Sequence, residues 1–472
     1  MTPQRENALM LASILGIGEE DASRRLCQSV AITHGDGPSA ILAREITDLI
    51  SRTLAIAKPG ELADVEIVIG VEPAGVARVQ RVVSFSPARV AISAAGSSVI
   101  CDSHGLLMAI GACYVVADAI AHAVGLQGIY CAEDPFVVPF GDLGIKPDLL
   151  DLPMVLTDAV LIGAGAIGNG FLRALRHMAV SGDLTIADPK KVGLGNPNRC
   201  LYFAASSVGH EKATELCERS QGDFGRLKLT PFVGEFTSLV RERTRVTSAI
   251  VAVDSRRVRR SVQKDLPFEV LDASTTAADE VVVHSHRQPN NGACLACIYT
   301  ELPDERGRAR DIANSLRVPL SEVLRGRIDG PTAELIASKH PGYAAHELEG
   351  RAYDSLFKEM CAQKALSLPS GEQVLAPFAF VSSLAGALLV VELANMHAAI
   401  ATGKTIPSRY FFTNPWRSPN LRARRNRGRL ANCEFCSDPD ASQAMQRVWG
   451  DRYEKRQSAI PPLPEAVSES GA

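Results

Sequence analysis

A glycine loop between an apolar segment and a helical one constrains this chain more than any other feature. Residues Ala159–Ile162 form a short apolar run typical of a strand buried in a parallel sheet. Gly163, Gly165 and Gly168 follow in GxGxxG spacing, and the next residues favour a helix to about Ser181. Small residues in such a turn let phosphate groups approach the backbone and the helix N-terminus. The pattern therefore predicts a nucleotide-binding α/β domain.

The order of the other segments predicts an α/β fold in two parts. We expect a first α/β domain at residues 1–150 and a second at 151–436, with a charged helical insertion at about 301–372 and a polar, partly disordered tail at 437–472. The spacing of the strands in the second domain favours a parallel, doubly wound sheet of the Rossmann type. The elements that we expect are helices at 38–57, 104–124 and 377–401 and strands at 65–70, 89–93, 184–187, 248–253 and 269–272.

Charge and hydropathy argue against a nucleic-acid-binding, a secreted or a membrane-spanning protein. The 50 Lys and Arg residues nearly balance 53 Asp and Glu, which gives a net charge of −3 and argues against nonspecific nucleic-acid binding. The segment at 8–17 is too short and interrupted for a signal peptide, so we expect a cytoplasmic protein. The longest uncharged stretch, 373–391, contains Pro377 and runs into Glu392, which favours a buried helix over a membrane span.

Polar residues after the glycine loop indicate phosphate chemistry. Asp188 ends a strand twenty-five residues after Gly163, where a ribose would be bound, and this much alone would fit a NAD-dependent oxidoreductase. Hydride transfer makes no use of the amides and cations that follow, whereas phosphoryl chemistry needs charge compensation. An acid after the next buried strand could hold Mg²⁺, or it could be an ordinary helix N-cap, and the cations could be surface charges. The residues concerned are Asn196, Asn198, Arg199, Lys212 and Asp254.

With these residues the chain resembles the ThiF, MoeB and ubiquitin-activating (E1-like) superfamily over about residues 155–436. The resemblance implies adenylation of the C-terminal carboxylate of a ubiquitin-like protein. It also implies that Asp188 binds ribose, that Arg199 and Lys212 contact ATP phosphates, and that Asp254 coordinates Mg²⁺. The first 150 residues would be a degenerate, inactive adenylation-like half. In its layout the chain looks most like bacterial activating enzymes from ubiquitin-like anti-phage operons.

Two residues depart from the family pattern. Lys190 stands where the family usually has a second acid, and Cys200 stands where it usually has Gln. The family also uses an arginine from the partner half at the phosphates, for which Arg24 or Arg25 is the candidate here.

The cysteines predict a structural metal site. Four of the eleven cysteines form two CxxC pairs, and no export signal accompanies them. Two pairs at this spacing supply four thiolates, which satisfy tetrahedral Zn²⁺ with no open position. The pairs are Cys294 with Cys297 and Cys433 with Cys436.

The resemblance also implies a thioester-forming cysteine just ahead of the apolar helix at 377–401. Cys361 has that position, and Lys358 and Lys364 lie three residues away on either side, where positive charge would favour the thiolate. An ordinary helix cysteine is the alternative interpretation, and Cys200 is the second candidate nucleophile.

The leading functional hypothesis is therefore an activating enzyme that uses ATP, Mg²⁺ and a structural zinc. Its partners would be a ubiquitin-like protein and a conjugating (E2-like) enzyme, with no nucleic acid and no membrane, and a homodimer is one option for its assembly. A sulfur-carrier or tRNA-modifying adenylyltransferase without a thioester step stays open, as does a nucleotide-binding scaffold. The dehydrogenase is the last alternative.

Overall fold

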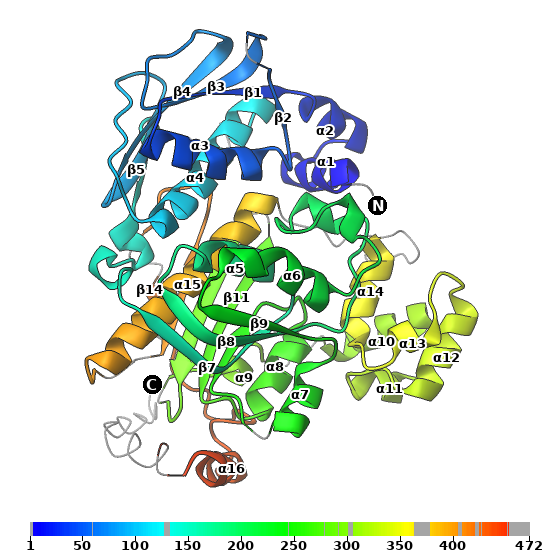
Figure 1. Cartoon of the computed structure of the whole chain (residues 1–472). Helices are drawn as coiled ribbons and strands as arrows, with labels where there is room; N and C mark the ends of the chain where they lie inside the picture. The colour runs from blue at the N-terminus through cyan, green and yellow to red at the C-terminus, as the bar shows by residue number, and fades with distance from the viewer. Residues whose placement is uncertain are drawn as a thin grey trace, which may run out of the picture.

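The structure is a computed structural model that describes residues 3–58, 60–126, 133–243, 245–277, 279–290, 292–300, 305–362, 378–404, 408–420, 424–425, 427–450 and 452. Its described strands form two mixed sheets, one in each half of the chain (Figure 1). The predicted α/β class is confirmed.

The first sheet belongs to the N-terminal half and has the strand order β2-β1-β3-β4-β5-β6. Strands β1 to β4 are parallel, and β5 and β6 are antiparallel. The helix after β1 ends at Ile50, earlier than the predicted residue 57, because residues 55–56 pair with β1 as a short strand. The elements are α1 (Pro3–Leu15), α2 (Glu19–Arg25), β1 (Ser29–His34), α3 (Pro38–Ile50), β2 (Ala55–Ile56), β3 (Ala63–Ile69), β4 (Ala77–Ser86), β5 (Arg89–Ser93), α4 (Gly105–Val124) and β6 (Phe136–Pro139).

The second sheet has the order β14-β13-β12-β11-β10-β7-β8-β9. Its parallel strands, numbered from the glycine loop, stand in the order 3-2-1-4-5 of a doubly wound fold. The elements of this part are β7 (Met154–Ile162), α5 (Ala166–Leu175), β8 (Val180–Ala187), α6 (Lys212–Ser220), β9 (Leu227–Phe232), α7 (Phe236–Arg243), β10 (Ser248–Val251), α8 (Arg256–Lys264) and β11 (Glu269–Ala277).

The strands predicted for this half are parallel, as expected, and beyond β11 the sheet continues with antiparallel strands that the sequence analysis did not predict. Only two residues separate β11 from β12 (Glu280–Arg287), and a connection that short allows a hairpin but no crossover. Strands β13 (Arg409–Thr413) and β14 (Arg424–Arg425) continue the antiparallel edge.

The two halves repeat one topology. In each half, parallel strands are followed by an antiparallel pair, and a long apolar helix lies between the two strands of that pair. The helix is α4 between β5 and β6 in the first half, and α15 (Ala379–Ala401) between β12 and β13 in the second. This repetition agrees with the expected duplicated fold.

The charged insertion is helical, as predicted, and has its own hydrophobic cluster. It lies at one side of the second sheet (Figure 1). After the short helix α9 (Leu295–Ile298), its elements are α10 (Glu305–Leu316), α11 (Leu320–Leu324), α12 (Gly330–Lys339), α13 (Ala345–Leu348) and α14 (Tyr353–Ala362).

The start of the C-terminal segment contains a helix that the sequence analysis did not predict. Residues Pro439–Trp449 form helix α16, capped by the side chain of Asp438. Trp449 packs on Phe268 with ring centroids 5.0 Å apart and donates a hydrogen bond to the Leu266 carbonyl. The predicted disorder concerns residues mostly outside the described part of the chain.

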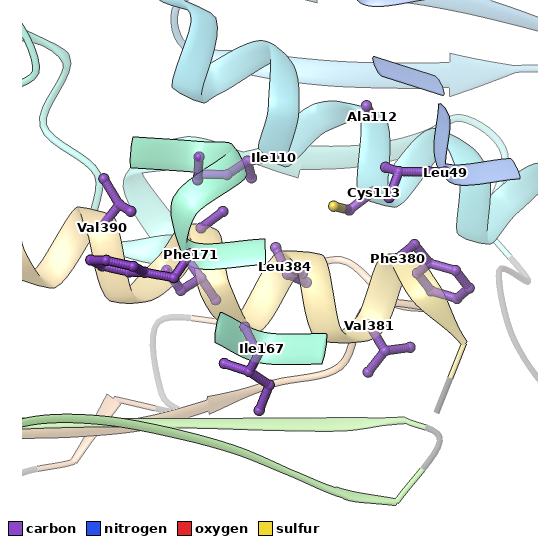
Figure 2. Packing of buried hydrophobic residues seen from close by; sticks show 14 of the residues in the cluster. Leu49, Ile110, Ala112, Cys113, Ile167, Phe171, Phe380, Val381, Leu384 and Val390 are labelled. Carbon is purple, nitrogen blue, oxygen red and sulfur yellow. The ribbon is translucent and has the colours of Figure 1, made fainter. Parts of the chain in front are cut away.

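One hydrophobic core joins the two halves. Helices α4, α5 and α15 pack together, with Ile110 of α4, Phe171 of α5 and Leu384 of α15 among the buried contacts (Figure 2). By length and composition alone, α4 and α15 could each cross a membrane. Both are covered by the surrounding protein, with 89% and 100% of their most apolar windows buried, as expected of core helices.

Candidate nucleotide and metal sites

The glycine loop follows β7 and leads into α5. A side chain at Gly163 would place its Cβ 2.8 Å from the Ala252 carbonyl oxygen, and one at Gly168 would reach the Gly163 carbonyl, so the loop closes this tightly only with glycine. At Gly165, the N-cap of α5, a Cβ would meet no described atom within 4 Å. The N-terminus of α5 therefore faces open space, where an anion would be favoured.

Asp188 lies directly after β8 and joins two loops. It is buried, and its carboxylate accepts hydrogen bonds of 2.8 Å from the backbone N–H groups of Ala164 and Lys190. Each oxygen keeps a further lone pair, so the carboxylate could still accept a bond from a ribose hydroxyl.

The segment 195–203, which we call the asparagine–arginine loop, carries three of the predicted site residues, and each has different contacts. Asn196 accepts a 2.9 Å hydrogen bond from the Gly193 N–H and so closes its own turn. Asn198 is 1% exposed, and both polar atoms of its amide lack a partner among the described residues. Arg199 forms an ion pair with Glu6 of α1.

Lys212 is the first residue of α6. Its backbone N–H donates to the Lys190 carbonyl, which holds it at the edge of the sheet that carries the glycine loop and Asp188, called here the nucleotide edge. In the described part of the chain its ammonium makes no ion pair. The charges of Arg199 and Lys212 both act on the thiol of Cys200, so both cations lie near that residue. A polyphosphate, whose oxygens accept hydrogen bonds, would satisfy the Lys212 ammonium and the Nδ2 donors of Asn198.

Asp254 follows β10 on the same edge of the sheet, with its side chain 55% exposed. It is not the N-cap of α8, because Ser255 has that position and accepts from the Val258 N–H. The Lys190 ammonium lies 3.4 Å from the Asp254 carboxylate. A single carboxylate at the phosphate edge suits Mg²⁺, which binds through one or two carboxylates and phosphate oxygens.

Arg259 of α8, five residues after Asp254, has a structural role. Its guanidinium is buried and contacts the Asp272 carboxylate and the carbonyls of Val253 and Ala273.

The helical insertion contacts this edge through polar side chains. Arg327 pairs with Glu235 at 2.5 Å, and Glu347 pairs with Lys191 at 3.3 Å. The Ser255 hydroxyl donates a 2.6 Å hydrogen bond to Asp354 of α14. The insertion is therefore held against the loops that carry Lys190 and Asp254.

The four predicted zinc ligands come together although the pairs are 139 residues apart. Their Sγ atoms all lie within 4.8 Å of one another, and three of the distances are 3.7 to 3.8 Å. Sulfurs about 2.3 Å from a tetrahedral Zn²⁺ would be about 3.8 Å apart, so the set fits zinc. Backbone N–H groups of Leu430 and Cys436 also point at Sγ atoms of the cluster and would stabilise thiolate charge.

The structure describes the side chain of only one of the two candidate nucleophiles, Cys200. Cys361 lies in the last turn of α14, but its side chain, Lys358's side chain and all of Lys364 lie outside the described part of the structure. Cys200 is buried, and burial raises the pKa of its thiol even though Arg199 and Lys212 oppose that effect. Cys200 is therefore a poor nucleophile.

Neither arginine suggested from the N-terminal half lies at the nucleotide edge. Arg24 pairs with Asp21 on its own helix, and Arg25 donates to the Val124 carbonyl at the end of α4. Residues that the sequence analysis missed do reach the edge: Glu6 contacts Arg199, and Asn169 donates to the carbonyls of Ala164 and Gly165. Asn169 had a weak signal, since it is a polar residue on the buried face of the helix after the fingerprint.

Comparisons with known proteins agree with this geometry. A family model described as the ThiF family matches residues 155–435, and one described as the E1 N-terminal domain matches residues 2–146. The uncharacterized protein y4jF of Sinorhizobium fredii is 27% identical over 324 residues, which are 65% of this chain and 61% of that protein. The chain thus spans about three fifths of the length of this curated relative.

Solved structures give weaker similarities. The crystal structure of E. coli MccB is 13% identical, with 76% of this chain and 95% of that chain covered and a TM-score of 0.38. For the crystal structure of E. coli MccB with ATP the values are 12%, 75%, 97% and 0.36. TM-scores this low carry no argument about the present chain.

Proposed function

The chain belongs to the ThiF family, and on that basis we propose that it activates the C-terminal carboxylate of a ubiquitin-like protein with ATP. A carboxylate oxygen attacks the α-phosphorus, the bond to pyrophosphate breaks, and an acyl-adenylate forms. A cysteine thiolate then attacks the acyl carbon, AMP leaves, and the resulting thioester is passed to a conjugating (E2-like) partner in the cytoplasm. Family membership supports the adenylyl transfer, and the ubiquitin-like substrate and the thioester are the proposed part.

The unpartnered amide of buried Asn198, which directly precedes Arg199 in the chain, carries this proposal. Arg199 and Lys212 would compensate the charge that builds on the phosphate oxygens as pyrophosphate leaves. Asp188, already oriented by two backbone N–H groups, would bind the ribose. Hydride transfer by a dehydrogenase would not require these cations.

Two metals belong to the proposal. Asp254 would hold Mg²⁺, which supplies charge neutralisation at the phosphates. Cys294, Cys297, Cys433 and Cys436 would hold a closed structural zinc with no part in the chemistry.

One contact favours a second candidate, a nucleotide-binding scaffold. The Lys190 ammonium pairs with the Asp254 carboxylate at 3.4 Å, so a cation of the chain itself stands where the metal would bind. A scaffold would bind ATP and give no pyrophosphate exchange.

The deciding experiment is exchange of labelled pyrophosphate into ATP, with and without a ubiquitin-like protein that ends in glycine. We expect exchange only when that protein is present. Arg199→Ala and Asp254→Ala should each abolish exchange while the fold survives, because each removes a charge that acts at the phosphates. Arg219→Ala is the matched control, since Arg219 pairs with Glu215 on its own helix and should leave exchange unchanged. Near wild-type, Mg²⁺-dependent exchange in Asp254→Ala would contradict its assigned role.

The thioester step has its own test. Cys361→Ala should leave pyrophosphate exchange intact and eliminate a reductant-sensitive conjugate with the ubiquitin-like protein on a non-reducing gel. A conjugate that persists in this variant would assign the thioester to another cysteine, and none in the wild type would favour a sulfur-carrier type of activation.

A further inference from the structure

Arg52 crosses from the N-terminal half to the asparagine–arginine loop of the ThiF half. It lies two residues beyond the end of α3, and its guanidinium donates to three backbone carbonyls of the loop. Nη1 is 2.5 Å from the Pro197 oxygen and 3.4 Å from the Phe203 oxygen, and Nη2 is 3.1 Å from the Leu201 oxygen. These carbonyls stand on both sides of Asn198 and Arg199, so one side chain fixes the path of the segment that carries both.

Helix α1 supports the same loop from a second direction. Asn7 donates a 2.7 Å hydrogen bond to the carbonyl of Arg52, and Glu6 pairs with the Arg199 guanidinium. The loop comes so close to α1 that a Cβ on Gly195 would lie 2.0 Å from the Glu6 carboxylate. Both members of the Glu6–Arg199 pair are largely buried, with 12% and 19% of their side chains exposed.

We infer that Arg52 is a positioning residue for nucleotide binding: the N-terminal half builds the phosphate-binding loop of the other half through it. This rests on the proposed function in so far as Asn198 and Arg199 contact the nucleotide. The planar guanidinium reaches three carbonyls at once, and a lysine ammonium, as a point charge on a flexible stem, cannot reproduce that fork. Glu6 assists by binding Nη1 of Arg199, which also donates to the Gly195 carbonyl of the loop at 3.4 Å.

The test compares Arg52→Lys with Asp48→Asn by equilibrium binding of Mg-ATP to the full chain. Asp48 also contacts the other half, through Arg173 of α5, and its charge acts on Arg52, so Asp48→Asn weakens the interface and the charge environment of Arg52 while the three carbonyl contacts of Arg52 stay in place. We expect the Kd for ATP to rise about tenfold in Arg52→Lys, the equivalent of one charged hydrogen bond, and to stay within about twofold in Asp48→Asn. An unchanged Kd in Arg52→Lys would overturn the inference.

Kinetic constants distinguish a positioning role of Arg52 from a role in folding alone. In pyrophosphate exchange, Arg52→Lys should raise the KM for ATP about tenfold and leave the KM for the ubiquitin-like protein unchanged. A purely structural role would lower the active fraction and move neither KM, which would also overturn the inference. If the wild type binds ATP without exchange, the proposed function fails, and the Kd comparison still decides the role of Arg52. Should Arg52→Lys not fold, Glu6→Ala replaces it, with weaker ATP binding as the supporting result and unchanged binding as the opposing one.

Discussion

Asn169 and Asn198 are both buried in the candidate nucleotide site, but their amides are satisfied differently. The Asn169 amide donates to the carbonyls of Ala164 and Gly165 and accepts from the Tyr202 N–H, so it ties the glycine loop to the asparagine–arginine loop. The Asn198 amide has no partner among the described residues. Asn169 therefore contributes to the fold, whereas Asn198 costs stability that a bound ligand would return.

This contrast predicts opposite effects of the same substitution. Asn198→Leu, which is close in size and apolar, should raise the free energy of unfolding of the ATP-free protein by about 1 kcal/mol, because an unsatisfied amide is removed. It should also weaken ATP binding at least tenfold, as a hydrogen-bonding partner is lost. Asn169→Leu should instead destabilise the ATP-free protein. Denaturant unfolding with and without ATP measures both, and a destabilised Asn198→Leu would show that its amide is satisfied in the folded protein.

Single residues also show what sequence alone could predict. Asp188, Asn198 and Arg199 stand in or near a local motif, and their placement at one sheet edge follows from strand order. Glu6 and Arg52 reach the same loop from 193 and 145 residues away, and no periodicity or spacing signals such a contact. Lys190 could be recognised as a departure from the family pattern, but its pairing with Asp254 required the fold.

At the scale of elements, α3 of the first half and α5 of the second are joined by a buried ion-pair cluster. Glu45 of α3 faces Arg173, Arg176 and His177 at the end of α5. Burial alone would raise the pKa of Glu45, but the interaction with His177 and the charges of both arginines outweigh it and lower the pKa to about 2 from its ordinary 4.5. The ionised carboxylate therefore stabilises the contact between the helices.

This pKa sets a pH dependence of stability. Because the folded-state pKa lies below the unfolded one, the contribution is fully present above about pH 5 and is lost as the pH falls from 4.5 toward 2. It amounts to about 3 kcal/mol. Wild type should exceed Glu45→Gln in unfolding free energy by about that much at pH 7, and the difference should shrink toward zero near pH 2. A difference that stays constant with pH would contradict the shared charge cluster.

The zinc cluster joins α9 to the segment before α16, and its spacing was readable in the sequence. We expect about one zinc per chain by metal analysis. Cys433→Ser should lose the zinc and lower the melting temperature by several degrees, since three ligands leave the site open. Cys217→Ser, a buried cysteine outside the cluster, should keep the full zinc content. Wild-type protein without zinc, and with stability unaffected by Cys433→Ser, would exclude the site.

Elements were predictable where the pattern was local and strong, as for β5, α4 and α15. The antiparallel strands β12 and β13 were missed. The buried polar residues His284, Ser285 and His286 interrupt the apolar run of β12, and Ser285 donates to its partner, Glu392 of α15, only in the folded chain. Helix α16 was missed because its few apolar residues pack against the cluster that contains the four cysteines, and this contact forms only in the folded chain.

At the scale of the whole molecule, the two halves share one core, whereas the insertion has a separate one. Ile110 of α4 and Trp416, which follows β13, belong to the same buried cluster, and Trp416 packs edge-on against Phe378 and Phe380. Ile336 of the insertion is equally buried but lies in the other cluster. Cooperative unfolding should follow these clusters rather than the sequence boundary between the halves.

The chain has two tryptophans, so a Trp449→Phe background leaves Trp416 as the single reporter of the shared core. In that background Ile110→Ala, a change in the N-terminal half, should lower the unfolding free energy reported by Trp416 by about 2 to 5 kcal/mol, because it opens a cavity in the core that contains both residues. Ile336→Ala creates a cavity of the same kind in the insertion and should leave the Trp416 transition nearly unchanged. Denaturant unfolding followed by Trp416 fluorescence compares the two. If Ile110→Ala left the Trp416 transition in place, the halves would unfold independently, and a role of the N-terminal half in building the nucleotide loop would lose its mechanical basis.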